Sequence, residues 1–173
     1  ESGQLDHAIA TFADVLAGDP GHAGALAALG RIEARTPSAG PRVRALLAAA
    51  HRTREDHAQL ANVLEKVATF DAPTPALLCE LGDLWIGPLG NPARAWPHVA
   101  RGYSLDPIGA DGEKCRARML DLSSRDATRA TPEQTSNARR VVQTLTDVAR
   151  SIVAAEPRRR RKEEDLAALD ALG

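Results

Sequence analysis

The stretch 75–107 constrains the fold of this chain more than any other. Leu78, Leu81 and Trp85 follow one another at the i, i+3, i+7 spacing that places apolar side chains on one face of a helix. Residues 87–92 read Gly-Pro-Leu-Gly-Asn-Pro, a composition that cannot remain helical. The stretch therefore predicts a helix, a turn and a second helix.

Small residues indicate how these two helices pack. Gly82 lies inside the first helix, where it costs about 1 kcal/mol relative to Ala. That cost is tolerated where another backbone must come close, and Ala95 offers a matching small surface on the second helix. Asn91 is suited to cap the second helix and Pro92 to be its first residue, while Pro97 falls within its first turns. We expect a helical hairpin with a close crossing.

The order of these residues is Leu78-x2-Leu81-Gly82-x2-Trp85, Ala95-x3-Val99 and Pro107. It resembles the tetratricopeptide repeat, whose signature is a large residue, x2, Leu-Gly, x2, an aromatic residue, then Ala-x3-Phe and a closing Pro. Leu78, Trp85 and Val99 replace the usual Trp, Tyr and Phe, and the turn is one residue longer than usual.

Two further stretches carry parts of the same signature. The intervals between Ala95, Val99, Gly102 and Pro107 recur in Ala8, Phe12, Val15 and Pro20. A partial third copy, Leu26-x2-Leu29-Gly30, follows at the offset that the repeat predicts. In this copy Glu33 stands where an aromatic residue is usual.

The resemblance implies an all-α fold, a right-handed solenoid of antiparallel helical hairpins over residues 1–125. Residues 3–17 correspond to the second helix of a hairpin whose first helix is missing, so we expect the chain to be part of a longer array. Residues 36–41 are predicted to form an irregular loop, followed by helices at 42–51 and 54–70 that form another hairpin. A short helix is predicted over residues 112–124.

The C-terminal part is predicted to differ from the repeats. Thr131 and Pro132 mark a helix start, and apolar residues continue at helical spacing to about residue 155. We interpret residues 126–157 as a long capping helix that covers the last apolar face of the array. Residues 158–173 are predicted to be a basic and acidic linker followed by a short amphipathic tail helix.

In the tetratricopeptide family the first helices of successive hairpins line a concave groove that holds a peptide or a helix of a partner. Carried over by register, this places Arg31, Arg35, Cys79 and Asp83 in the groove. The family's carboxylate-clamp members use Lys and Asn on these faces. The chain has three Lys residues and none lies on the two matched helices, so we do not expect a binder of that type.

No motif for catalysis, phosphate binding or metal binding is present, and we expect neither enzyme activity nor a cofactor or metal. His51 and His57 are six residues apart and would lie on different helical faces. Cys79 and Cys115 are too few and too far apart in sequence to indicate a disulfide scaffold or a metal site. Cys79 could point into the groove and react, but free cysteines usually act as small buried apolar residues, and this role is favoured.

The basic run Arg158, Arg159, Arg160, Arg161 and Lys162 leaves three interpretations open. It favours a solvated linker paired with the acidic residues 163–165, ahead of a site for an acidic partner and then for nucleic acid. No aromatic residue follows Tyr103, so no stacking platform accompanies the run. The net charge of −1 also argues against binding DNA through the overall charge.

The sequence therefore predicts a scaffold for protein–protein interactions. The alternative is a regulatory or structural helical module within a larger multidomain enzyme. No signal peptide or membrane-spanning run is visible, and we predict a cytoplasmic protein with no membrane partner. Neighbouring repeats or domains of the same polypeptide are expected partners as well.

Overall fold

A computed structural model of the chain describes residues 2–127, 140, 143–145, 147–148, 150–151 and 154. These residues form helices and short connections, with no strand among them, and the predicted all-α class is confirmed. The elements are α1 (Ser2–Gly18), α2 (Ala23–Arg35), the 3-10 helix η1 (Pro37–Ala39), α3 (Gly40–Thr53), α4 (His57–Phe70), α5 (Pro75–Ile86), α6 (Pro92–Leu105) and α7 (Ala110–Ala127).

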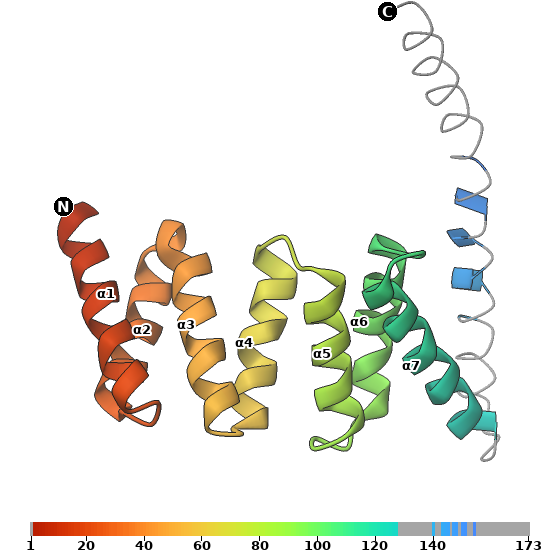
Figure 1. Cartoon of the computed structure of the whole chain (residues 1–173), viewed down its shortest axis with the longest axis horizontal. Coiled ribbons are helices and arrows are strands. Elements are labelled where there is room, and N and C mark those ends of the chain that lie inside the picture. The colour runs from red at the N-terminus through yellow and green to blue at the C-terminus, as the bar shows by residue number, and fades with distance from the viewer. Residues whose placement is uncertain are drawn as a thin grey trace, which may run out of the picture.

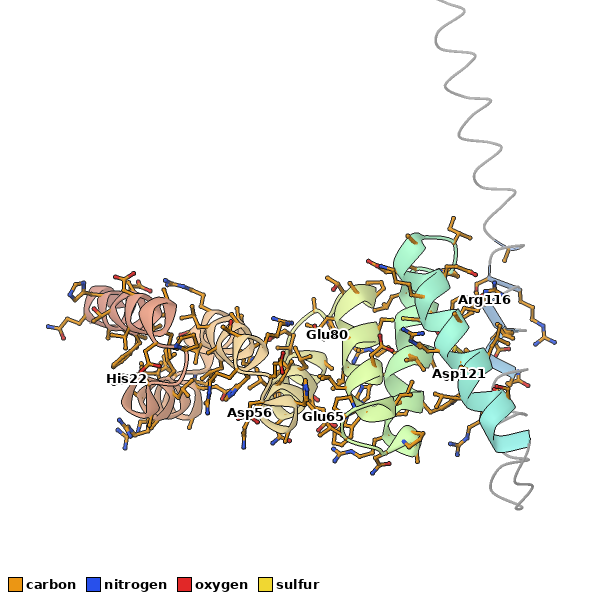
Figure 2. The ribbon with its side chains drawn as sticks, turned by 60° about the horizontal axis from the view of Figure 1, so that its bottom comes forward. His22, Asp56, Glu65, Glu80, Arg116 and Asp121 are labelled. Atoms are coloured by element: carbon orange, nitrogen blue, oxygen red, sulfur yellow. The ribbon has the colours of Figure 1, made fainter. Side chains whose placement is uncertain are left out.

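The helices stand side by side in an elongated row, and the chain reverses direction at each short connection (Figure 1). Each helix packs on the next one along the chain, and α1 also contacts α3 while α5 contacts α7. Odd-numbered helices therefore form one layer and even-numbered helices the other. In Figure 2, His22, Asp56 and Glu65 of the α2 and α4 layer lie below Glu80 of α5.

Ion pairs connect neighbouring helices within each layer. Every helix from α1 to α5 is joined to the helix two further along the chain by one such pair. The pairs are Asp6–Arg42, Glu33–Lys66, Arg52–Glu80, Glu65–Arg94 and Asp83–Arg118. Most of these side chains are exposed, and an exposed ion pair contributes between about 0 and 1 kcal/mol to stability. The pairs therefore orient neighbouring helices more than they stabilise the fold.

The predicted close crossing lies between α5 and α6. A Cβ added to Gly82 would lie 2.4 Å from Cγ1 of Val99 and 4.0 Å from the carbonyl oxygen of Ala95. Position 82 therefore does approach α6 at Ala95, but the nearest atom belongs to Val99, one turn further along. Asn91 caps α6 as predicted, because its side chain accepts a hydrogen bond from the backbone N–H of Arg94.

A second glycine, Gly102, allows α6 to approach both α5 and α7 at the same position along its length. A Cβ at Gly102 would lie 2.6 Å from Sγ of Cys115, 3.2 Å from Cβ of Leu78 and 3.4 Å from the carbonyl oxygen of Pro75. These three helices pack together more extensively than the helices of the first half of the chain. The stretch 75–107 thus forms the best-packed part of the structure together with α7.

The first half departs from the predictions in its connections. Residues 36–41 are not an irregular loop, because η1 leads directly into α3, which begins at Gly40 instead of residue 42. Pro41 occupies the first turn of α3, where its missing N–H costs no helical hydrogen bond. The predicted helices 54–70 and 112–124 are observed as α4 and α7, with Asp56 capping α4 and α7 extending to Ala127. As predicted, α3 and α4 pack together.

Gly30 and Gly82, which occupy the same place in the sequence pattern, have different surroundings. A Cβ at Gly30 would meet no atom within 4 Å, whereas Gly82 is pressed against Val99. Three residues further on, Trp85 is buried and the guanidinium of Arg94 covers its ring at 3.8 Å from the centroid. At the corresponding place in α2, Glu33 leaves a hollow beside Gly30.

The described positions between residues 140 and 154 are all helical, and Val148 is buried with the core. The predicted helix start at Thr131, the basic run Arg158–Lys162 and the tail helix lie outside the described residues. The prediction of separate units at 1–125, 126–157 and 158–173 therefore stays a prediction.

We expect Gly82→Ala and Gly30→Ala to change stability in opposite directions. The new Cβ at position 82 would displace Val99, whose branched side chain has little rotamer freedom in a helix, at a cost of about 1–3 kcal/mol. At position 30 the space is open, and the higher helix propensity of Ala should stabilise the fold by up to about 1 kcal/mol. The measurement is the free energy of unfolding in urea; equal changes in both variants would contradict the close crossing.

Candidate functional site

A hollow of about 430 Å³ opens beside α5 and α7 and reaches the N-terminus of α4. We call it the α5–α7 hollow. Its lining residues are His57, Ala76, Cys79, Glu80, Asp83, Leu84, Pro88, Asp111 and Lys114. A hollow of this volume lies within the range of known ligand pockets.

The sequence of α5 explains why this face is open. Leu78, Leu81 and Trp85 turn inward and are buried. Ala76, Cys79 and Asp83 follow one another three and four residues apart, which places them on a second face of the same helix. Ala76 and Leu84 leave an apolar floor because Ala76 is too small to fill the space.

Ion pairs surround this floor. Arg118 of α7 holds the carboxylate of Asp83 with two hydrogen bonds, and Arg52 of α3 holds Glu80 with bonds of 2.6 and 2.7 Å. Hydrogen bonding to these carboxylates raises the pKa of both Arg118 and Arg52 above the ordinary value. Both arginines stay charged throughout the physiological pH range.

The third carboxylate of the hollow, Asp111, accepts a hydrogen bond of 2.8 Å from Lys114. This bond raises the pKa of Lys114. Because each carboxylate lining the hollow already has a cationic partner, none is a free general base. Within the described residues, no group of His, Cys, Asp and Glu side chains is arranged to hold a metal ion.

Of the four residues predicted for a groove, Cys79 and Asp83 line the α5–α7 hollow. Arg31 and Arg35 line a separate hollow of about 250 Å³, together with Phe12, Ala28, Ile32 and Thr36. The structure therefore brings the predicted residues together in two pairs and does not join the pairs in one site. The reason is that α2 and α5 lie in opposite layers.

No pattern in the sequence indicates that Cys79 and Cys115 lie near each other. Both thiols are buried, Cys79 in α5 and Cys115 in α7, and these two helices pack together. Sγ of Cys115 also lies 3.6 Å from the carbonyl oxygen of Pro75, and it occupies the space that Gly102 leaves free. Only the packing of α7 on α5 brings these cysteines together.

A third hollow, of about 550 Å³, lies beside a charged network. Arg44 of α3 binds Asp71 through hydrogen bonds of 2.5 and 2.8 Å, and it also reaches Glu33 at 3.3 Å. Lys66 completes the network with a bond of 2.7 Å to Glu33. The side chains of Arg44 and Glu33 are each 9% exposed. The hydrogen bond to Asp71 raises the pKa of Arg44.

One member of this charged network, Glu33, stands at the sequence position where the tetratricopeptide signature has an aromatic residue. Glu33 replaces that aromatic residue in sequence, and Arg44 and Lys66 supply the two cations that make its burial possible. Phe70 lies at the edge of the same hollow, 72% exposed, with the Arg44 guanidinium 6.0 Å from its ring centroid.

No protein-family model matches the chain, and comparisons with curated proteins and with solved structures found no match either. Among the described residues, no helix is both long enough and apolar enough to cross a membrane.

We expect Arg44→Met to lower the free energy of unfolding by about 3 kcal/mol, since it removes the partner of a buried carboxylate. This value is at the low end for buried pairs because the network borders a hollow. The matched control is Arg42→Met, two residues earlier in α3, which removes an exposed pair with Asp6 and should cost at most about 1 kcal/mol. Urea denaturation measures both variants. Similar losses would show that the buried network has no special role.

Two half-buried or buried histidines predict a dependence of stability on pH. Burial lowers the pKa of His51 and of His98 below the ordinary value of 6.5, against the smaller opposing effects of Asp56 and Glu65. The nearest oxygen of Asp56 lies 3.6 Å from Nδ1 of His51, too far for a strong hydrogen bond. Both imidazoles are therefore neutral in the folded protein near neutral pH.

Because the unfolded chain binds these protons more readily, the stability contributed by the neutral imidazoles should be present above about pH 6.5 and be lost as the pH falls below it. Urea denaturation at pH 7.5 and 5.5 measures the loss. A double variant, His51→Gln with His98→Gln, should lose less stability over this interval, while the exposed His7→Gln control should behave as the wild type does. An unchanged loss in the double variant would contradict this assignment.

Proposed function

We propose that this protein is an interaction scaffold, a right-handed solenoid of tetratricopeptide type that binds a partner peptide or helix in a concave groove. The observation that carries the proposal is the α5–α7 hollow, which has an apolar floor and a rim of ion pairs on successive helices of one layer. Helical arrays of this kind bind extended ligands on surfaces formed by successive repeats.

The hollow also indicates what kind of peptide fits. Ala76 and Leu84 form a floor for one or two apolar side chains, since about 430 Å³ holds little more than that. The rim charges are already paired, so a strongly charged ligand would have to break the pairs of Asp83 or Glu80. We therefore propose a peptide with an apolar anchor and little net charge in its central part.

This proposal includes no catalytic step. Binding that depends on apolar burial should change little between low and moderate salt, whereas binding by Lys and Arg patches weakens with salt. The rim is consistent with the first behaviour because Arg52, Arg118 and Lys114 each have a carboxylate partner.

Screening a library of displayed peptides against the protein, followed by titration of the selected peptides, tests this proposal. Ala76→Arg places a long side chain across the floor of the hollow, and we expect it to weaken binding at least about tenfold, which corresponds to about 1.4 kcal/mol. Ala93→Arg is the matched control. Both alanines are exposed and follow the proline that begins their helix, but Ala93 does not line the hollow.

The control should bind the selected peptides as the wild type does, and both variants should unfold at the same urea concentration as the wild type. Selected peptides that bind the wild type and Ala76→Arg equally would place the binding surface elsewhere. A library that yields no specific peptide at all would count against the scaffold proposal itself.

A further inference from the structure

The thiols of Cys79 and Cys115 have no stated role in peptide binding, although Cys79 lines the α5–α7 hollow. They lie on α5 and α7, which pack together, and Sγ of Cys115 lies 3.6 Å from the carbonyl oxygen of Pro75, about one helical turn before Cys79. Cys115 is fully buried against Gly102 and Pro75. Cys79 is 5% exposed and lines the α5–α7 hollow, so small solutes reach it from that side.

The surroundings make the two thiols chemically different. The neighbouring Cys115 thiol lowers the pKa of Cys79, and the charges of Arg118 and Lys114 act in the same direction. Burial and the carboxylate of Asp83 oppose this change. The neighbouring Cys79 thiol, together with burial, raises the pKa of Cys115. The thiol that opens on the hollow is thus the more acidic of the two, and the buried one keeps its proton.

We propose that Cys79 is a peroxide-reactive thiol and that Cys115 resolves its oxidised form, giving a disulfide that links α5 to α7. The placement carries this inference, since Cys79 lines the hollow and Cys115 is buried against the first turn of the same helix, α5. It does not depend on peptide binding.

The oxidant is hydrogen peroxide, and the reaction takes place in two steps. The Cys79 thiolate attacks one peroxide oxygen, the O–O bond breaks, and hydroxide leaves while Cys79 becomes a sulfenic acid. The sulfur of Cys115 then attacks the sulfenic sulfur, the S–O bond breaks, and the leaving hydroxide takes the Cys115 proton to form water. The hydroxide from the first step becomes water by taking up the proton that Cys79 released on ionising. Both sulfurs are thus oxidised to a disulfide, and one peroxide is reduced to two waters.

The test exposes the reduced full chain to hydrogen peroxide. Free thiols are then alkylated, and the digested protein is mapped by mass spectrometry. We expect both thiols to be lost together, a cross-linked peptide containing Cys79 and Cys115, and a reaction about tenfold faster than that of free glutathione. The oxidised protein should contain no disulfide between two chains and should regain both thiols on reduction. Two thiols that stay free, or a disulfide between two copies of the chain, would overturn the proposal.

Two variants separate the roles. In Cys115→Ala the sulfenic acid has no resolving thiol, so a 1,3-diketone probe should label Cys79; an unlabelled Cys79 would overturn its assignment as the attacking thiol. In Cys79→Ala the reaction of Cys115 should slow at least about tenfold, because it is shielded from the hollow. If Cys115 reacts equally fast in Cys79→Ala and in the wild type, the assignment of Cys79 as the first thiol to react is overturned. Circular dichroism checks that both variants fold, and the peptide map of the wild type decides the outcome if either does not.

Discussion

The contact between Gly82 and Val99 is the constraint on which the arrangement of α5, α6 and α7 depends. Because no side chain separates the helices there, α6 lies close enough to α5 for Gly102 to reach Leu78 as well. The same short distance leaves room for α7 to place the Cys115 thiol against α6. Close packing of this kind gains dispersion energy at many atoms, and a single added methyl group disturbs it.

The position three residues after the glycine of the Leu-x2-Leu-Gly pattern is filled differently in the two halves of the chain. In α5 the space below the crossing is filled by Trp85, whose ring is covered by Arg94. In α2 the corresponding residue is Glu33, and burying it requires Arg44 and Lys66. The Trp85 ring carries no net charge, whereas a buried carboxylate is stable only while its cationic partners are in place. The second solution leaves a hollow beside Gly30 and gains less from burial.

The sequence predicted the features that depend on neighbouring residues. The helices, the cap at Asn91 and the close approach at Gly82 all follow from spacing and turn chemistry within a few residues. Long-range features could not be predicted in this way. The meeting of Cys79 with Cys115 depends on how α7 lies across α5, and no local pattern encodes that geometry. The pairing of Glu33 with Arg44 could have been suspected from an unmatched acidic residue on an apolar face.

The stacking order of the helices has a consequence for any long ligand. The Leu-x2-Leu-Gly pattern occurs in α2 and in α5, which are separated by two helices and not by one. As a result, the pattern lies in the layer of even-numbered helices at α2 and in the layer of odd-numbered helices at α5. A long ligand bound along the layer of odd-numbered helices would contact α1 and α3, which lack the pattern, and then α5, which carries it. A long ligand lying along one side of the molecule would therefore contact the Leu-x2-Leu-Gly face in only one half of the chain.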